Sequence, residues 1–159
     1  MIKHTLQIFL IAITSIILLS FSYNNRDFQT ECVKIENDGY ITIKIWNPKK
    51  GSKYKSVHAR KNAIYAILFS GVSGGKACST QLPILNKPEF IDNFKRIEKN
   101  FFSKKGKWSS FTRSANSETT LSDNIEDKKC KIYEVSISKN ELRKYLEEQK
   151  IIKSLTNSF

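Results

Sequence analysis

The chain has 159 residues, which suffices for one domain once a short N-terminal segment is set aside. A content of 40% hydrophobic and 11% aromatic residues is normal for a folded protein and excludes wholesale disorder. The net charge of +12 favours acidic or anionic partners and says nothing about the fold.

Residues 1–22 have the three parts of a signal peptide in the required order. Lys3 is the only charged side chain, and an apolar run from Leu6 to Leu19 follows it. Ser20 and Ser22 then place small residues before a cleavage point, as signal peptidase requires. We therefore expect export to the periplasm or the extracellular space.

The segment has two alternative fates. Its strongest apolar run is shorter than the roughly 20 residues that cross a bilayer, but the uncharged stretch 5–25 is longer and leaves an uncleaved membrane anchor open. Lipid attachment needs a cysteine directly after the apolar run. The first cysteine, Cys32, comes about ten residues later, so a lipoprotein is not expected.

Past the signal peptide we expect a flexible leader over 23–32 and a single domain over 33–155. Residues 33–46 are predicted as strand, with Ile41, Ile43 and Ile45 on one face. The turn residues at 36–39 make a hairpin possible.

A helix is predicted over 57–69, with Ser56 as its N-cap and alanines at helical spacing. Gly71 is expected to end it in a left-handed conformation. Residues 71–83 are rich in glycine and serine and are predicted as a loop.

The second half of the chain continues with a helix that opens at Pro88 and runs to about residue 100. Its buried stripe is expected to comprise Phe90, Phe94, Ile97 and Phe101. A turn over 104–107, the start of a strand over 108–113 and a polar hairpin loop over 116–127 are predicted next.

Residues 131–138 alternate in polarity and are predicted as a strand. Ser138 and Glu141 have the spacing of a capping box, which begins a last helix running to about residue 150. This order of elements predicts an α+β fold, a two-layer sandwich with a small antiparallel sheet packed by about three helices.

Residues with catalytic or metal-binding chemistry are few. Cys32, Cys78 and Cys130 permit at most one intramolecular disulfide and leave one thiol over. His58 is the only histidine after the signal peptide, so a histidine-based zinc site is not expected. A pair of Cys78 with His58 is disfavoured because a helix separates them. We predict no catalytic residue, no metal and no cofactor.

Basic clusters are the most visible surface feature, and they lie at 49–55, 99–107 and 128–131. Interleaved aromatics would suit a single-strand nucleic-acid binder, but export and the preference for lysine over arginine argue against nucleic acid. The candidate binding surface comprises Lys104, Lys105, Lys107 and Trp108, with the 71–83 loop as a second surface. The expected partner is an envelope protein or an anionic envelope polymer; the membrane is contacted only through the export segment, and the oligomeric state stays open.

Three segments carry a resemblance to known families: Gly39–Ile45, Ala59–Ile64 and Ala66–Gly71. They resemble small uncharacterised envelope proteins of Bacteroidetes-type bacteria. More distantly they are similar to the domain shared by the flagellar assembly protein T and LPP20 lipoproteins, in which a strand precedes a helix packed on a sheet. The resemblance implies an envelope accessory or assembly role and transfers no active site. The chain departs from the lipoprotein pattern because it lacks the lipid-attachment cysteine.

The sequence therefore predicts an exported cell-envelope accessory or binding protein without catalytic activity. Two alternatives stay open: a secreted hydrolase whose site residues cannot be named, and an inhibitor or immunity-type protein that blocks a partner by shape.

Overall fold

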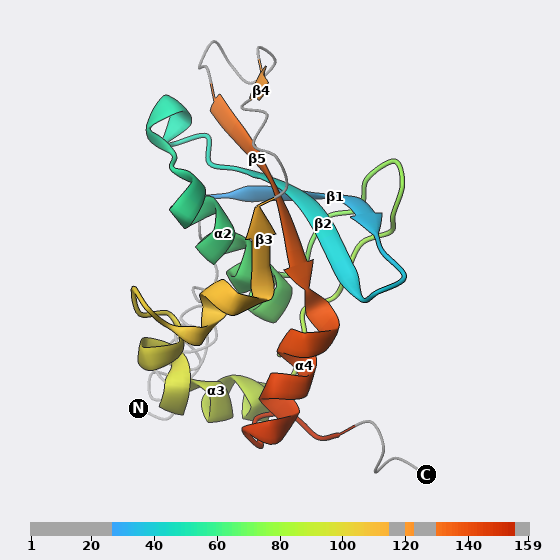
Figure 1. The fold of residues 1–159 in the computed structure, drawn as a ribbon, viewed down its shortest axis with the longest axis vertical. Coiled ribbons are helices and arrows are strands. Elements are labelled where there is room, and N and C mark those ends of the chain that lie inside the picture. Colours follow the sequence, from blue (N-terminus) through green and yellow to red (C-terminus); the bar gives the residue numbers. More distant parts are fainter. Residues whose placement is uncertain (1–26, 115–119, 123–129, 155–159) are drawn as a thin grey trace, which may run out of the picture.

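The computed structural model of the chain describes residues 27–114, 120–122 and 130–154 (Figure 1). The predicted signal peptide and most of the predicted hairpin loop over 116–127 lie outside the described residues. The strands are β1 (Gln29–Ile35), β2 (Tyr40–Trp46), β3 (Thr112–Ser114), β4 (Thr120–Ser122) and β5 (Cys130–Ser138). The helices are α2 (Ser56–Tyr65), α3 (Pro88–Phe101) and α4 (Lys139–Glu148), with short helical turns η1 (Gly51–Lys53), η2 (Ala66–Ser70) and η3 (Lys107–Phe111).

All strand pairs are antiparallel, in the order β1-β2-β5-β3. β2 pairs with one edge of β5 along its whole length, and β3 and β4 pair with successive parts of the other edge. The first two strands form a hairpin across the turn predicted at 36–39. The predicted α+β class, with an antiparallel sheet and three helices, is confirmed.

The core lies between one face of the sheet and the helices. Ile41, Ile43 and Ile45 are at most 1% exposed, so the predicted apolar face of β2 is confirmed. Helix α2 and the η2 turn that continues it cover this face, while α3 and α4 lie at one end of the sheet (Figure 1). Burial of this face supplies the main driving force for folding.

The flexible leader predicted over 23–32 extends too far into the domain. β1 begins at Gln29 and pairs with β2 from that residue onward. Phe28 packs against Tyr65 with ring centroids 6.4 Å apart, and Cys32 is only 1% exposed. The polar composition of this stretch concealed an edge strand, which needs only one buried face.

Of the two predicted N-caps, Ser56 is wrong, and Ser138 is confirmed in position but not in its hydrogen bond. Ser56 is the first residue of α2, and Lys55 occupies the cap position. Ser138 does occupy the cap position of α4, but its side chain makes no capping hydrogen bond. Ser138 is also the last residue of β5 and is 3% exposed, so strand pairing sets its orientation. Gly71 ends η2 with φ +77° and ψ 179°, a positive φ as predicted but an extended ψ.

The strand predicted to begin at Trp108 begins later. Residues 107–111 form the η3 turn, and β3 starts only at Thr112. Helix α3 follows its prediction closely, since it opens at Pro88 and buries Phe94 and Phe101.

No helix in the described part of the chain has the length and apolar content needed to cross a bilayer.

Candidate binding sites

The predicted binding surface is divided by the structure. Lys104, Lys105 and Lys107 are exposed, but Trp108 is only 4% exposed. Its indole Nε1 donates a hydrogen bond to the backbone carbonyl of Ser103 at 2.8 Å. The ring therefore cannot stack on a ligand, and the lysines are left as a solvated cationic turn.

Arg60 packs against the buried indole of Trp108. The guanidinium of Arg60 lies 5.8 Å from the centroid of the Trp108 ring and donates from Nε to the Thr112 hydroxyl at 2.9 Å. It also donates to the backbone carbonyls of Ser109 and Thr112. Arg60 thus connects α2 to the η3 turn and to β3. Arg60 and Trp108 therefore stabilise the fold.

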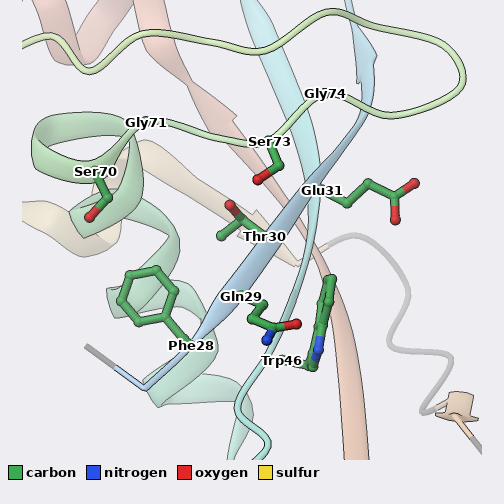
Figure 2. A pocket seen from close by; sticks show the side chains of 9 residues that line it. All are labelled: Phe28, Gln29, Thr30, Glu31, Trp46, Ser70, Gly71, Ser73 and Gly74. Atoms are coloured by element: carbon green, nitrogen blue, oxygen red, sulfur yellow. The ribbon is translucent and has the colours of Figure 1, made fainter. Parts of the chain in front are cut away.

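A groove of about 500 Å³ runs beside the start of β1. Figure 2 shows its two sides, with Thr30 on the side of the 70–73 segment and Trp46 on the opposite face of the strand. Its lining combines two aromatic side chains with hydroxyl, amide and carboxylate groups. These residues are Phe28, Gln29, Thr30, Glu31, Trp46, Ser70, Gly71, Ser73 and Gly74.

A disulfide joins β1 to the loop that supplies Ser73 and Gly74 to this groove. Cys32 in β1 is bonded to Cys78 in the predicted 71–83 loop, with their Cα atoms 5.8 Å apart. The Cys32 amide donates to the Ser73 carbonyl at 2.8 Å. Gly75 lies so close to β1 that a Cβ there would approach the Cys32 carbonyl oxygen to 2.1 Å. The loop is therefore held against β1 and forms one wall of the groove.

The backbone of Thr30 is an open part of the β1 edge beside this groove. In an antiparallel ladder, alternate residues turn both backbone groups toward the same neighbour. The Cys32 amide points away from β2, so the amide and carbonyl of Thr30, two residues earlier, point the same way. No hydrogen bond joins the Thr30 backbone to another described residue on that side. Unpaired edge groups of this kind can pair with another chain.

Trp46 contributes a second unpaired donor at the groove. Its indole Nε1 is buried and has no hydrogen-bond partner among the described residues. A buried donor without an acceptor costs about 1–3 kcal/mol. Glu31 is the only ionisable side chain among the described residues that line this groove.

A second pocket, of about 350 Å³, is strongly cationic. It lies where the 82–87 segment, the first turn of α3, α4 and residues 152–154 meet. Lys87, Lys139, Arg143 and Lys153 line it, and no acidic residue does so within the described part of the chain. Its apolar lining comprises Leu82, Pro83, Ile84, Phe90 and Ile152.

The cations of this pocket have weak partners. Lys139 donates to the neutral amide oxygen of Gln81 at 3.1 Å, and Lys87 lies 5.5 Å from the centroid of the Phe90 ring. Burial, with a smaller effect of Arg143, lowers the pKa of Lys139. The Lys139 ammonium is thus partly desolvated and is held beside another cation.

Arg143 is the only one of the four with an ion-pair partner in the described residues. Its Nε lies 3.2 Å from a Glu147 carboxylate oxygen. The same Nε–H is buried and lacks an aligned acceptor. We take the short distance as an electrostatic contact without a well-formed hydrogen bond, since hydrogen bonds weaken steeply with misalignment. The pocket therefore keeps an excess of positive charge.

A third hollow, of about 320 Å³, involves Lys107 from the predicted surface. Its other charged lining residues are Lys144, Glu141 and Glu148. Two bases and two acids offset one another, so this hollow does not attract either sign of ligand.

The thiols and the histidine are not arranged for catalysis. Cys78 is in the disulfide, and the buried Cys130 thiol lies 3.4 Å from the Asn47 carbonyl, to which it donates. Burial raises the pKa of the Cys130 thiol. His58 is exposed near the start of α2, where partial desolvation and neighbouring lysines lower its pKa. No group of His, Cys, Asp or Glu among the described residues has the geometry of a metal site.

Comparisons of the chain with protein-family models, with curated proteins and with solved structures found no match. The functional argument therefore starts from the groove beside β1 and from the cationic pocket.

Proposed function

We propose that the chain is an exported binding protein of the cell envelope, and that the groove beside β1 is its contact surface for an envelope protein. The observation that carries this proposal is the Cys32–Cys78 disulfide. The bond indicates an oxidising compartment, and it holds one wall of the groove against β1.

The disulfide supports export. Disulfides form and persist in oxidising compartments and are rare in the cytosol. The predicted signal peptide over residues 1–22 would deliver the chain to such a compartment. The signal-peptide pattern and the disulfide lie in different parts of the chain, so each supports export independently of the other.

The groove supports binding of an extended chain. A partner segment placed beside Thr30 would pair with its free amide and carbonyl, as in recognition by β-strand addition. The Cys32–Ser73 hydrogen bond closes the edge two residues later, so the partner segment must end or turn there. Phe28 and Trp46 offer aromatic surface on the two sides of the strand for the partner's alternating side chains.

The groove chemistry favours recognition over catalysis. General acid–base catalysis needs a positioned proton donor or acceptor, commonly with a second group that orients it. Glu31 has no titratable companion among the described lining residues. Hydroxyls from Ser70 and Ser73 and the Gln29 amide suit hydrogen bonding to a peptide instead.

Replacement of one residue tests this proposal. Thr30→Pro removes the outward amide that a partner strand needs, while the β1–β2 hydrogen bonds stay intact because they come from the neighbouring residues. Thr30→Ala is the matched control, because it changes the side chain and keeps the amide.

The immobilised mature chain should capture a defined set of envelope proteins, and Thr30→Pro should lose them while Thr30→Ala keeps them. Thermal unfolding of both variants checks that the fold is intact. If folded Thr30→Pro captures the same proteins as the wild type, the groove is not the contact surface.

A further inference from the structure

The cationic pocket between α3 and α4 lies apart from the β1 groove and shares no lining residue with it. We propose that this pocket binds an organic phosphate, with the phosphate held by Lys139 and Arg143 and the organic part resting on the apolar floor. The inference stands independently of the protein-binding function proposed for the β1 groove.

The charge of the pocket selects a dianion. Four cationic side chains line it, and within the described residues only Arg143 has a carboxylate partner, Glu147. A phosphate monoester carries a charge of about −1.5 to −2 at neutral pH and offers three acceptor oxygens. It would therefore offset more of this positive charge than a single carboxylate can.

The donors of the pocket are available. Lys139 uses its ammonium on a neutral amide, and the only ion pair of Arg143 with a described residue is the contact of its Nε with Glu147. Both residues lie in the N-terminal half of α4 and line the pocket. A cation that is partly desolvated beside another cation destabilises the empty pocket, and an anion would relieve that cost.

The apolar floor selects an organic part. Phe90 and Ile152 line the pocket beside the cations, and Leu82 is 76% exposed at its rim. An exposed leucine next to a charged hollow leaves apolar surface in water, and a ligand with a hydrocarbon or aromatic part would cover it. A soluble phosphate ester and a phospholipid headgroup share this chemistry.

Calorimetric titration of the full mature chain with phenyl phosphate tests the inference, with inorganic phosphate and phenol as the separate halves of the ligand. Phenyl phosphate should bind at least about tenfold more tightly than either half, which is about 1.4 kcal/mol. If inorganic phosphate binds as tightly as phenyl phosphate, the apolar lining residues do not contribute to binding.

Two double variants of equal charge separate the pocket from general electrostatics. Lys139→Gln with Arg143→Gln should weaken phenyl phosphate binding by about tenfold or more. Lys104→Gln with Lys105→Gln removes the same charge from the exposed turn and should leave the affinity unchanged. An equal loss in both variants, or no binding to the wild type, overturns the proposal.

Vesicles distinguish the two sources of the phosphate. Co-sedimentation with phosphatidic acid vesicles that is lost in the pocket variant, and is absent with phosphatidylcholine alone, assigns the phosphate to a lipid headgroup. Phenyl phosphate binding without pocket-dependent vesicle binding assigns it to a soluble ester. Either result supports the pocket once the wild type binds phenyl phosphate, and absence of that binding overturns the proposal whatever the vesicles show.

Discussion

Cys32 in the edge strand β1 is covalently bonded to Cys78 in the loop that follows η2, across 46 residues of the chain. The bond holds the loop against the strand at the point where the Cys32 amide also donates to Ser73. One side of the β1 groove is therefore fixed by a covalent bond and a hydrogen bond together.

Loss of the disulfide should destabilise the domain. Because the bond closes a loop of 46 residues, the chain-entropy model assigns it about 4 kcal/mol. The double variant Cys32→Ala, Cys78→Ala should unfold at a lower urea concentration than the oxidised wild type by a corresponding free energy. Identical urea midpoints for the two proteins would mean that the bond does not restrain the unfolded chain.

Gly75 should resist substitution while its neighbour tolerates it. A Cβ at Gly75 would lie 2.1 Å from the Cys32 carbonyl oxygen, whereas one at Gly74 would come no closer than 3.0 Å to Thr80. We expect Gly75→Ala to cost about 1–3 kcal/mol, because backbone must move to admit the methyl group. Gly74→Ala is the control and should cost less. Equal urea midpoints for the two variants would contradict the close approach of the loop to β1.

Trp108 should contribute to the stability of the fold and not to a binding surface. Trp108→Ala empties a buried site and removes the hydrogen bond to Ser103, with an expected cost of about 3–5 kcal/mol. The neighbouring Lys107→Ala should change the free energy of unfolding by less than about 0.5 kcal/mol. Chemical denaturation measures both. A Trp108 variant as stable as the Lys107 variant would place the indole on the surface.

The contrast between Ile43 and Trp108 shows how far sequence reasoning reaches. Strict alternation around Ile43 has one physical explanation, a strand with one buried face, and the structure agrees. Trp108 follows a lysine-rich turn, and this local composition predicts a solvent-exposed side chain. The buried indole contacts Arg60, which lies 48 residues earlier on another element, and donates to the Ser103 carbonyl. Contacts between distant segments leave no local pattern.

The Cys130 thiol should be unreactive in the folded protein. It is buried, 1% exposed, and burial raises its pKa, so little thiolate forms near neutral pH. Iodoacetamide should label Cys130 only after denaturation, with the disulfide left intact. Mass spectrometry of the labelled peptides makes the measurement. Rapid labelling of the native protein at pH 7 would contradict the burial of this residue.

His58 should titrate below its ordinary pKa of 6.5, because of partial desolvation first and then the nearby Lys50, Lys55 and Lys61. A lowered pKa in the folded state means that His58 stabilises the fold fully above its unfolded pKa. That contribution is lost as the pH falls through the folded pKa. NMR titration gives the value, and added salt should raise it by screening the lysines. A folded pKa at or above 6.5 contradicts this environment.

The two candidate sites show why the sequence predicts the fold better than it predicts the binding sites. The 71–83 loop was expected to be a surface, and it is a wall of the β1 groove. The pairing of Cys32 with Cys78 had no sequence signal, because three cysteines allow three possible bonds. The cationic pocket was missed because its basic residues are spread from Lys87 to Lys153 and no charge run marks them.

The central claim is that the chain acts outside the cytoplasm as a disulfide-bonded binding protein. The full-length chain, expressed in a bacterium and recovered by osmotic shock, should be analysed by intact mass and by a peptide map without reduction. The account predicts a product that begins at residue 23 and a cross-linked peptide joining Cys32 to Cys78. A soluble cytosolic product that retains Met1 and has three free thiols would contradict it.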